Sequence, residues 1–305
     1  MAVSHSLPLS KSQVESIPKA ALLMVAASIF FVIMNSMAKK LSGQIPTQEI
    51  AFFRSFVNFV ILLPIILIKR RSFMGNNKKV MFIRSILGYM SLFLAFYSVN
   101  HGQIAESTIL IKTSIIFSAL FSAIFLREKI NAKIFAASLV GFLGATLIID
   151  PNPSNLSFIP GVAAILSGLI IGLIAVTLRK LQRTDDSLSI VFAFSMWGSL
   201  FGLIASWSSF VVPDLNQSLI LLATGSSGLI AQFLFTESFK FGPASEIHPF
   251  MYSEIIFAII IGTIFFNESI KFTTILGAVL IVISGISILK VKSLQKQSKS
   301  LLATE

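Results

Sequence analysis

Long apolar runs, separated by short connections rich in charge, Pro or Gly, make up nearly the whole chain. A helix of roughly 20 apolar residues, each rising about 1.5 Å, crosses the ~30 Å hydrocarbon layer of a bilayer. The pattern therefore predicts an all-α integral membrane protein with ten transmembrane helices. These spans are expected over residues 18–38, 47–68, 80–99, 104–126, 131–149, 160–178, 187–209, 217–239, 244–266 and 272–289.

The composition agrees with a chain that lies in a lipid bilayer. Of the 305 residues, 55% are hydrophobic and only 12% are charged, whereas soluble domains carry about 25% charged residues. The net charge of +11 is expected to set membrane orientation, and no nucleic-acid partner is expected. The chain has no Cys, which excludes thiol catalysis, Cys-ligated metal and disulfides.

Lys and Arg are distributed unevenly between the two sides of the predicted bundle. The N-terminal tail, the even-numbered connections and the C-terminal tail hold 18 of them, and the odd-numbered connections hold 3. Positive residues favour the cytoplasmic side, so both termini are expected in the cytoplasm and the protein in the cell's inner (plasma) membrane. The remaining three, Arg54, Arg84 and Lys112, fall within spans.

The chain repeats itself at a constant offset of 140 residues. Residues 88–130 and their partners share 13 identities in 43 positions, including the pairs Gly88/Gly228, Gly102/Gly242, Glu106/Glu246 and Glu128/Glu268. Because each repeat holds five spans, an odd number, the second copy enters the membrane from the opposite side. Such an inverted repeat is typical of secondary transporters, which work by alternating access.

The repeat defines the expected domains. They are a cytoplasmic tail (1–17), a first five-helix repeat (18–149), an outside loop (150–159), a second five-helix repeat (160–289) and a basic cytoplasmic tail (290–305). Small residues four apart, Gly168 with Gly172 and Gly198 with Gly202, allow close helix approach and are expected to pack within the molecule. The oligomeric state stays open.

Several short motifs resemble the EamA family of the drug/metabolite transporter superfamily. They are EIAFFR (Glu49 to Arg54), the Arg84 to Gly88 stretch, and FLRE and FFNE at the ends of the fourth and ninth spans. The resemblance covers about 18–289 and implies a ten-helix exporter or importer of small metabolites, often amino acids or their derivatives. The stretch PFMYSEIIFAIIIGTIFFNE further resembles S-adenosylmethionine carriers, in which Pro, Tyr and Glu recur at the positions of Pro249, Tyr252 and Glu254. Many members have a proline in the middle of span four, which this chain lacks.

Two opposite charges lie near the middle of the membrane. Lys112 is nine residues beyond Gln103, about 13 Å along its helix, and Glu254 is eleven beyond Pro243, about 16 Å. Inverted-repeat transporters place their sites at this depth. In one interpretation Lys112 receives a substrate carboxylate and Glu254 an ammonium or other cationic group. In the other, the two form a buried ion pair that only fixes packing.

Aromatic residues surround Glu254 in the sequence. His248 and Tyr252 are four apart and are expected to share a helix face. With Phe250 they can form an aromatic wall against a cation or a purine ring, so all three join Lys112 and Glu254 as candidate substrate-binding residues. Pro249 is expected to bend this helix. His248 either carries a proton in a coupled cycle or is hydrogen-bonded to a neighbour.

Further charges near the span ends are candidates for a gate or for proton coupling. Glu106 and Glu246 each lie just inside a helix N-terminus, where the helix dipole also favours a carboxylate. Arg54 is expected to pair with Glu49 or Glu106. Arg84 is expected to reach the cytoplasmic boundary, and Glu128 and Glu268 are interpreted as loop or helix-end charges.

The sequence thus favours a secondary transporter for a small polar metabolite such as an amino acid or S-adenosylmethionine. A nucleotide-sugar or sugar-phosphate exchanger of the same superfamily is the alternative. An integral-membrane enzyme is a remote one, because all four Asp lie in connections and the three His are scattered without metal-ligand spacing. No cofactor and no metal are expected.

The predicted orientation can be tested by labelling, because the chain has no native thiol. Single cysteines at Ser6 and Ser300 should react with a membrane-impermeant thiol reagent only after the cells are opened, since both ends are expected in the cytoplasm. A cysteine at Ser154, in the predicted outside loop, should react in intact cells. Labelling of only one chain end in intact cells would contradict the even number of spans.

Overall fold

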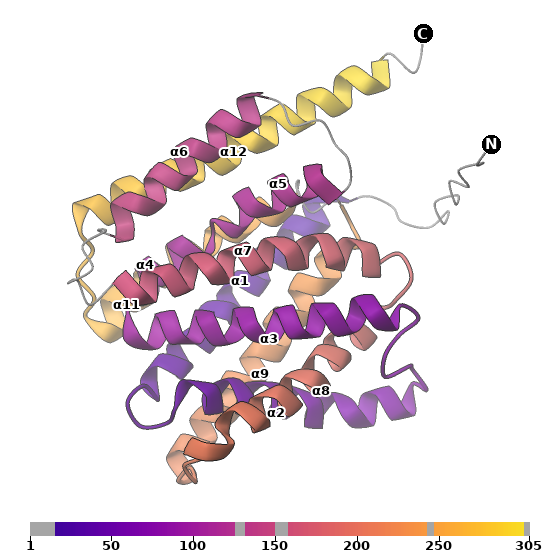
Figure 1. The fold of residues 1–305 in the computed structure, drawn as a ribbon, viewed down its shortest axis with the longest axis vertical. Coiled ribbons are helices and arrows are strands. Elements are labelled where there is room, and N and C mark those ends of the chain that lie inside the picture. The colour runs from indigo at the N-terminus through magenta and orange to yellow at the C-terminus, as the bar shows by residue number, and fades with distance from the viewer. Residues whose placement is uncertain (1–15, 126–131, 150–157, 243–246, 302–305) are drawn as a thin grey trace.

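The computed structural model describes residues 16–125, 132–149, 158–242 and 247–301, all of which belong to helices or short connections. The helices are α1 (Ile17–Lys40), α2 (Thr47–Ile68), α3 (Lys78–His101), α4 (Ile104–Ile111), α5 (Ser114–Phe125), α6 (Ala132–Ile149), α7 (Phe158–Leu181), α8 (Ser187–Ser206), η1 (Trp207–Ser209), α9 (Leu215–Ser238), η2 (His248–Tyr252), α11 (Ser253–Phe266) and α12 (Phe272–Leu301). No strand occurs in these residues. Figure 1 shows a bundle in which α6 and α12 lie together along one edge.

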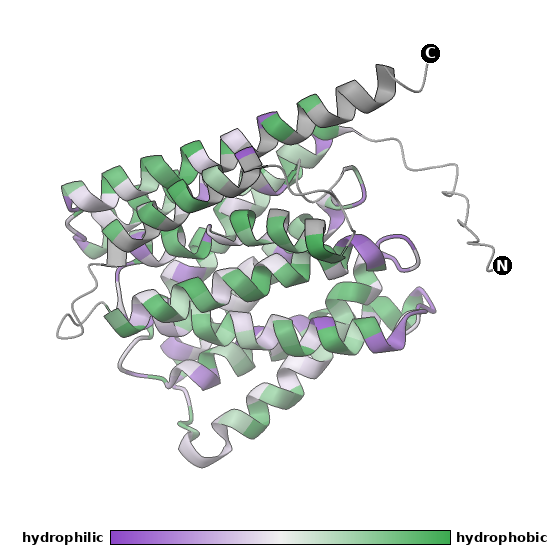
Figure 2. Cartoon of the chain, turned by 45° about the horizontal axis from the view of Figure 1, so that its top comes forward, coloured by the Kyte–Doolittle hydropathy of each residue, from purple (hydrophilic) through white to green (hydrophobic). Residues whose placement is uncertain are grey.

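Within the described residues, six helices are long and apolar enough to cross a membrane, namely α1, α2, α3, α7, α8 with η1, and α9. Two shorter apolar stretches, Phe250–Phe266 and Phe272–Ser284, accompany them. Many large apolar residues on the helices are exposed, and much of the helical ribbon in Figure 2 has the green of hydrophobic residues. The total of ten spans stays a prediction. The apolar exterior is the surface that contact with lipid requires.

The fourth and ninth predicted spans, 104–126 and 244–266, are not continuous helices, contrary to expectation for the fourth. Lys112 and Thr113 form a turn between α4 and α5, and the tighter 3₁₀ helix η2 precedes α11, which begins at Ser253. The two breaks lie at equivalent positions of the 140-residue offset. A broken helix leaves polar backbone groups that are tolerated at membrane depth only where protein or a cavity surrounds them.

The helix contacts follow the internal repeat. The offset relates α1 to α7, α2 to α8 and α3 to α9. Accordingly α1 packs along α9 as α7 packs along α3, and α2 contacts α9 as α8 contacts α3. Equivalent helices also pack on each other, α2 against α8 and α6 against α12.

Glycines on α8 show the relative direction of α2 and α8, the first of these two pairs of equivalent helices. A Cβ atom on Gly198 would lie 2.8 Å from the hydroxyl oxygen of Ser55, and one on Gly202 would lie 2.7 Å from the Cα atom of Phe52. Residues later in α8 therefore contact residues earlier in α2, so the two helices are antiparallel. The expectation that these glycines pack within the molecule is confirmed, and the same holds for those of α7, which face α5 and the α4–α5 turn.

The pair α6 and α12 runs in the same antiparallel way. A Cβ atom on Gly141 would meet Ser284, and one on Gly144 would meet the carbonyl of Gly277 at 2.7 Å. The Ser284 hydroxyl also donates a hydrogen bond to the carbonyl of Ala137 at 2.5 Å. Equivalent helices that point in opposite directions are what an inverted repeat requires.

The connections between helices fall into two sets, and hydrogen bonds join the members of each set. The segment before α1 bonds to the connection after α9 (Ser16 N–H to the Phe241 carbonyl, 3.0 Å), and the connection before α3 bonds to the one before α8 (Asn76 side chain to the Thr184 carbonyl, 2.6 Å). The first, third and ninth predicted connections meet around Glu268. Even-numbered connections thus contact each other and odd-numbered ones contact each other, in keeping with spans that cross alternately.

Candidate substrate site

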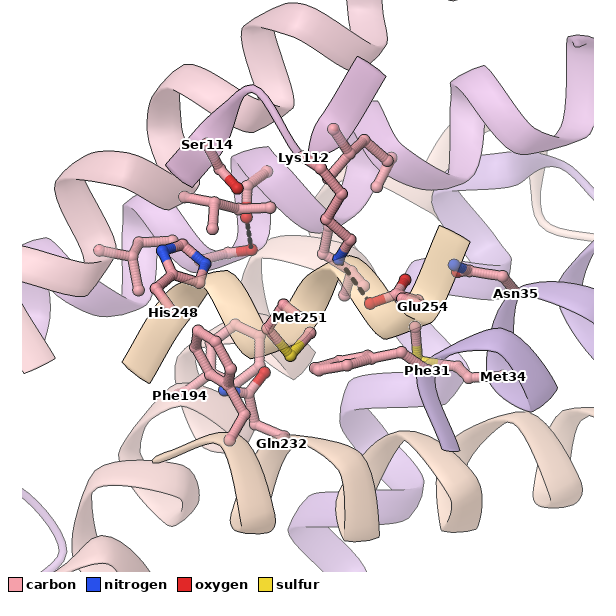
Figure 3. A pocket seen from close by; sticks show the side chains of 18 of the residues that line it. Phe31, Met34, Asn35, Lys112, Ser114, Phe194, Gln232, His248, Met251 and Glu254 are labelled. Carbon is pink, nitrogen blue, oxygen red and sulfur yellow. Dashed lines mark hydrogen bonds and ion pairs between the residues drawn. The ribbon is translucent and has the colours of Figure 1, made fainter. Parts of the chain in front are cut away.

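A buried cavity of about 110 Å³ lies between the two repeats, at the level of the helix breaks. By this measure one water needs about 10–15 Å³, so the space holds several waters or the polar part of a small ligand. The polar residues that line it are Asn35, Arg54, Arg84, Ser91, Lys112, Ser114, Gln232, His248 and Glu254. Figure 3 shows many of these side chains converging on one space from helices of both halves.

Lys112 and Glu254 form an ion pair in this cavity. The Lys112 ammonium nitrogen lies 2.5 Å from a Glu254 carboxylate oxygen, and each residue is only 4% exposed. The dashed line of Figure 3 joins them. Lys112 occupies the turn between α4 and α5, and Glu254 lies in the first turn of α11. The ion pair is the contact that the second of the two sequence interpretations described, and binding of substrate by Lys112 and Glu254 stays a prediction.

The 3₁₀ winding of η2 decides which side chains point at the cavity. Such a helix has three residues per turn, so residues three apart share a face, and His248, Met251 and Glu254 all line the cavity. Tyr252, expected on the His248 face, instead donates its hydroxyl to a backbone carbonyl of α12 at 3.0 Å. Phe250 is 36% exposed. The predicted aromatic wall of Tyr252 and Phe250 is therefore wrong, because it assumed α-helical spacing.

His248 is buried at one end of the cavity. Its Nδ1 atom lies 3.4 Å from the hydroxyl oxygen of Ser118 on α5. Its ring makes edge-on contacts with Phe235 of α9 and with Phe239, the residue that follows α9, at centroid distances of 5.8 and 6.4 Å. Of the two roles considered from sequence, these contacts support the hydrogen-bonded one.

Arg54 does not form the ion pair expected with Glu49 or Glu106. Its guanidinium is 1% exposed and donates to the carbonyl of Gly228 and the side-chain oxygen of Gln232, each at 3.3 Å. The side chain crosses from α2 to α9 and lines the cavity. The expectation was wrong because it compared depth along the membrane only, while the neighbour of a side chain also depends on which helix it faces.

The carboxylates near the span ends have other partners. Glu49 accepts a hydrogen bond from the Val211 backbone N–H at 2.9 Å, and Glu106 accepts one from the Thr274 hydroxyl at 3.1 Å. Glu106 lies in the first turn of α4, as expected. Glu246 lies outside the described residues. A gating or coupling role for Arg54, Glu106 and Glu246 stays a prediction.

Arg84 was expected to reach the membrane surface, but it is 1% exposed and lines the cavity. The Phe194 ring contacts both guanidiniums, with the Arg84 and Arg54 Cζ atoms 4.3 and 4.9 Å from its centroid. A Cβ atom on Gly88 would lie 2.6 Å from an Arg84 nitrogen, and one on Gly228 would lie 3.0 Å from an Arg54 nitrogen. These two glycines, equivalent in the repeat, leave the space that the arginines fill.

Glu268 lies in the connection between α11 and α12, as expected for a loop or helix-end charge, and it forms an ion pair there. It is 8% exposed and lies 2.5 Å from the Lys39 ammonium. It also accepts from the first backbone N–H groups of α4, those of Ile104 at 2.8 Å and Ala105 at 3.3 Å. A carboxylate at this position is stabilised by the helix dipole, and it ties three connections together on one side of the bundle.

Sequence reasoning missed Asn35, Gln232 and Phe194 as cavity residues. The two amides carried a usable signal, since each is a hydrogen-bonding side chain within an apolar span, where such groups face the protein interior. Phe194 carried none, because the chain has 29 Phe and only the folded structure shows which one lies between two arginines.

An all-helical bundle with an apolar exterior and a charge-lined central cavity is the architecture of a multi-pass membrane transporter. The model of the EamA-like transporter family matches residues 18–150 and 159–290. The chain therefore belongs to this family, whose members are named as transporters and not as enzymes.

Known relatives agree with this assignment. The chain is 32% identical over 275 residues to the pseudopaline exporter CntI of Pseudomonas aeruginosa (89% of this chain, 96% of the relative). It is 23% identical over 252 residues to the S-adenosylmethionine uptake transporter of Rickettsia bellii (81% and 84%). A solved crystal structure covers 90% of this chain and 98% of its own, with a TM-score of 0.67 at 17% identity, and so shares the fold.

Substitutions in the buried pair test its energetics. Lys112→Met or Glu254→Met alone leaves an unpaired buried charge and should lower the free energy of unfolding by about 3–5 kcal/mol, whereas the double substitution should cost much less. The measurement is thermal unfolding of purified protein in detergent. The matched control is the more exposed Glu237–Lys240 pair, whose removal should cost no more than about 1 kcal/mol. Single substitutions no costlier than this control would contradict the buried pair.

Proposed function

We propose that the protein is a secondary carrier that moves a small amino-acid-like metabolite across the plasma membrane by alternating access between its two repeats. In this proposal ten helices span the membrane, both termini are cytoplasmic, and Lys112 and Glu254 hold the substrate's carboxylate and ammonium. The observation that carries it is the ion pair in the cavity at the two helix breaks. The pair combines the charges that a zwitterion needs with the position at which inverted-repeat transporters bind.

A purely structural role explains the pair less well. Burying two charges costs several kcal/mol per ion, and apolar residues of similar volume usually give equal or better stability. An ion pair that opens to bind a zwitterion loses little electrostatic free energy. The ammonium of Lys112 exchanges the Glu254 carboxylate for the carboxylate of the substrate, and Glu254 exchanges Lys112 for the ammonium of the substrate. Lys112 and Glu254 can therefore pair with each other in the absence of substrate and separate when the substrate binds.

The helix breaks supply the second requirement of a carrier, which is two arrangements of one scaffold. The turn at Lys112 and Thr113 divides the fourth span at the depth of the cavity, so α4 and α5 can tilt separately, and the change from 3₁₀ to α-helical winding at Ser253 is a second point of adjustment. Glycine contacts hold α7 closely against the α4–α5 turn, which couples motion of this turn to the other repeat. Access from one side can then open as access from the other closes.

The relatives support a small-molecule substrate and leave its identity open. One is named for export of pseudopaline and one for uptake of S-adenosylmethionine, so the direction of transport differs between them. An amino acid or its derivative fits the opposite charges at Lys112 and Glu254. We therefore propose this substrate class and no transport direction.

Exchange transport in liposomes tests the proposal. A thermal-shift screen of amino acids, nucleosides and S-adenosyl compounds selects the compound that stabilises the protein most, and its saturable uptake and counterflow are then measured. Glu254→Gln and Lys112→Ala should each reduce exchange at least about tenfold, since each removes a charge-assisted contact. Glu237→Gln and Lys240→Ala, in the more exposed pair, should leave exchange unchanged. Unchanged affinity and rate in both cavity variants, at normal membrane abundance, would refute the site.

A further inference from the structure

Two buried arginines in the cavity have donors that no protein group accepts. The Nε and Nη1 atoms of both Arg54 and Arg84 are fully enclosed and have no hydrogen-bond partner. Arg54 uses its Nη2 atom for its two contacts to α9. Four N–H-bearing nitrogens of two cavity-lining residues therefore lie without a protein acceptor. Buried polar groups in native proteins are normally hydrogen-bonded, so such a cluster calls for an explanation.

The charges that line the cavity do not balance. Among its described lining residues, Arg54, Arg84 and Lys112 are positive and Glu254 alone is negative. Glu254 is already occupied by Lys112. The Phe194 ring contacts both guanidiniums, but an aromatic face compensates a buried cation much less than a carboxylate does. The residues that line the cavity therefore carry an excess of positive charge.

The surroundings of the two arginines are shaped to hold them. Gly88 and Gly228 occupy equivalent positions of the two repeats, and an added Cβ atom would lie 2.6 Å from an Arg84 nitrogen at Gly88 and 3.0 Å from an Arg54 nitrogen at Gly228. Packing alone would be served as well by apolar residues of similar volume. The planar fork of Arg matches carboxylate and phosphate oxygens in a two-bond geometry, which Lys does not offer.

We propose that Arg54 and Arg84 form an anion subsite, so that the preferred substrate is an amino-acid derivative with a further carboxylate or phosphate and a net negative charge. This inference rests on the proposed function, with Lys112 and Glu254 holding the zwitterionic end. It separates this chain from a carrier of S-adenosylmethionine. That molecule is a net cation, because its sulfonium and ammonium outweigh its single carboxylate.

Matched ligand pairs test the charge preference directly. Full-length protein in detergent is titrated with L-glutamate against L-glutamine, O-phospho-L-serine against L-serine, and S-adenosylmethionine, and the apparent dissociation constants are obtained from thermal shifts. At least one acidic ligand should bind at least about tenfold more tightly than its neutral partner, and S-adenosylmethionine should bind more weakly than that acidic ligand. The glutamate and phosphoserine arms show whether the subsite prefers carboxylate or phosphate.

Variants assign the preference to the two arginines. Arg54→Gln and Arg84→Gln should each abolish the preference for the acidic ligand, Arg84→Lys should restore only part of it, and Arg71→Gln, in an exposed connection, should leave it intact. If a Gln variant fails to fold, the preference of the unaltered protein between matched ligands decides.

The subsite would be overturned by equal binding within both matched pairs, by tighter binding of S-adenosylmethionine than of the acidic ligands, or by an acidic preference that survives in both Gln variants. Absence of any shift with the acidic ligands at millimolar concentration would also overturn it. A different result refutes the proposed function, namely exchange transport that is unchanged by the Lys112 and Glu254 substitutions.

Discussion

The cost of placing charge at the centre of a membrane governs this structure. Arg54, Arg84, Lys112 and Glu254 cannot face lipid, since an ionisable group at that depth costs at least about 2.5 kcal/mol, and all four are turned into one cavity. The helix breaks lie at the same depth, because freed backbone groups need the same shelter. The close glycine contacts then allow helices to surround the cavity tightly. Apolar side chains are left for the exterior, where lipid covers them.

The two halves of the chain share their helix arrangement, whereas the charged residues of the cavity differ between the halves. The 140-residue offset relates Lys112 to Tyr252, Glu254 to Ser114 and Arg54 to Phe194, so no cavity charge is matched by a charge in the other repeat. The helix breaks and the glycine pairs Gly88/Gly228 and Gly102/Gly242 recur in both halves. In the proposed function, the duplicated bundle provides two related conformations, and the charges that occur in only one repeat provide the substrate site.

Local patterns in the sequence were enough for most helix positions and for the repeat, because both follow from the order of residues along the chain. Lateral neighbours were not predictable in this way. Arg54 was assigned the wrong partner and Arg84 the wrong environment, since both depend on packing against α8 and α9. The Tyr252 prediction failed for a different reason, namely that 3₁₀ winding changes which residues share a face.

The most direct test of the central claim is a structure of the full-length protein in a lipid nanodisc, determined with the ligand that gives the largest thermal shift. The account predicts ligand density between Lys112 and Glu254, with the ion pair opened and an acidic group of the ligand against the guanidiniums of Arg54 and Arg84. Ligand bound elsewhere, with the Lys112–Glu254 pair intact, would contradict it.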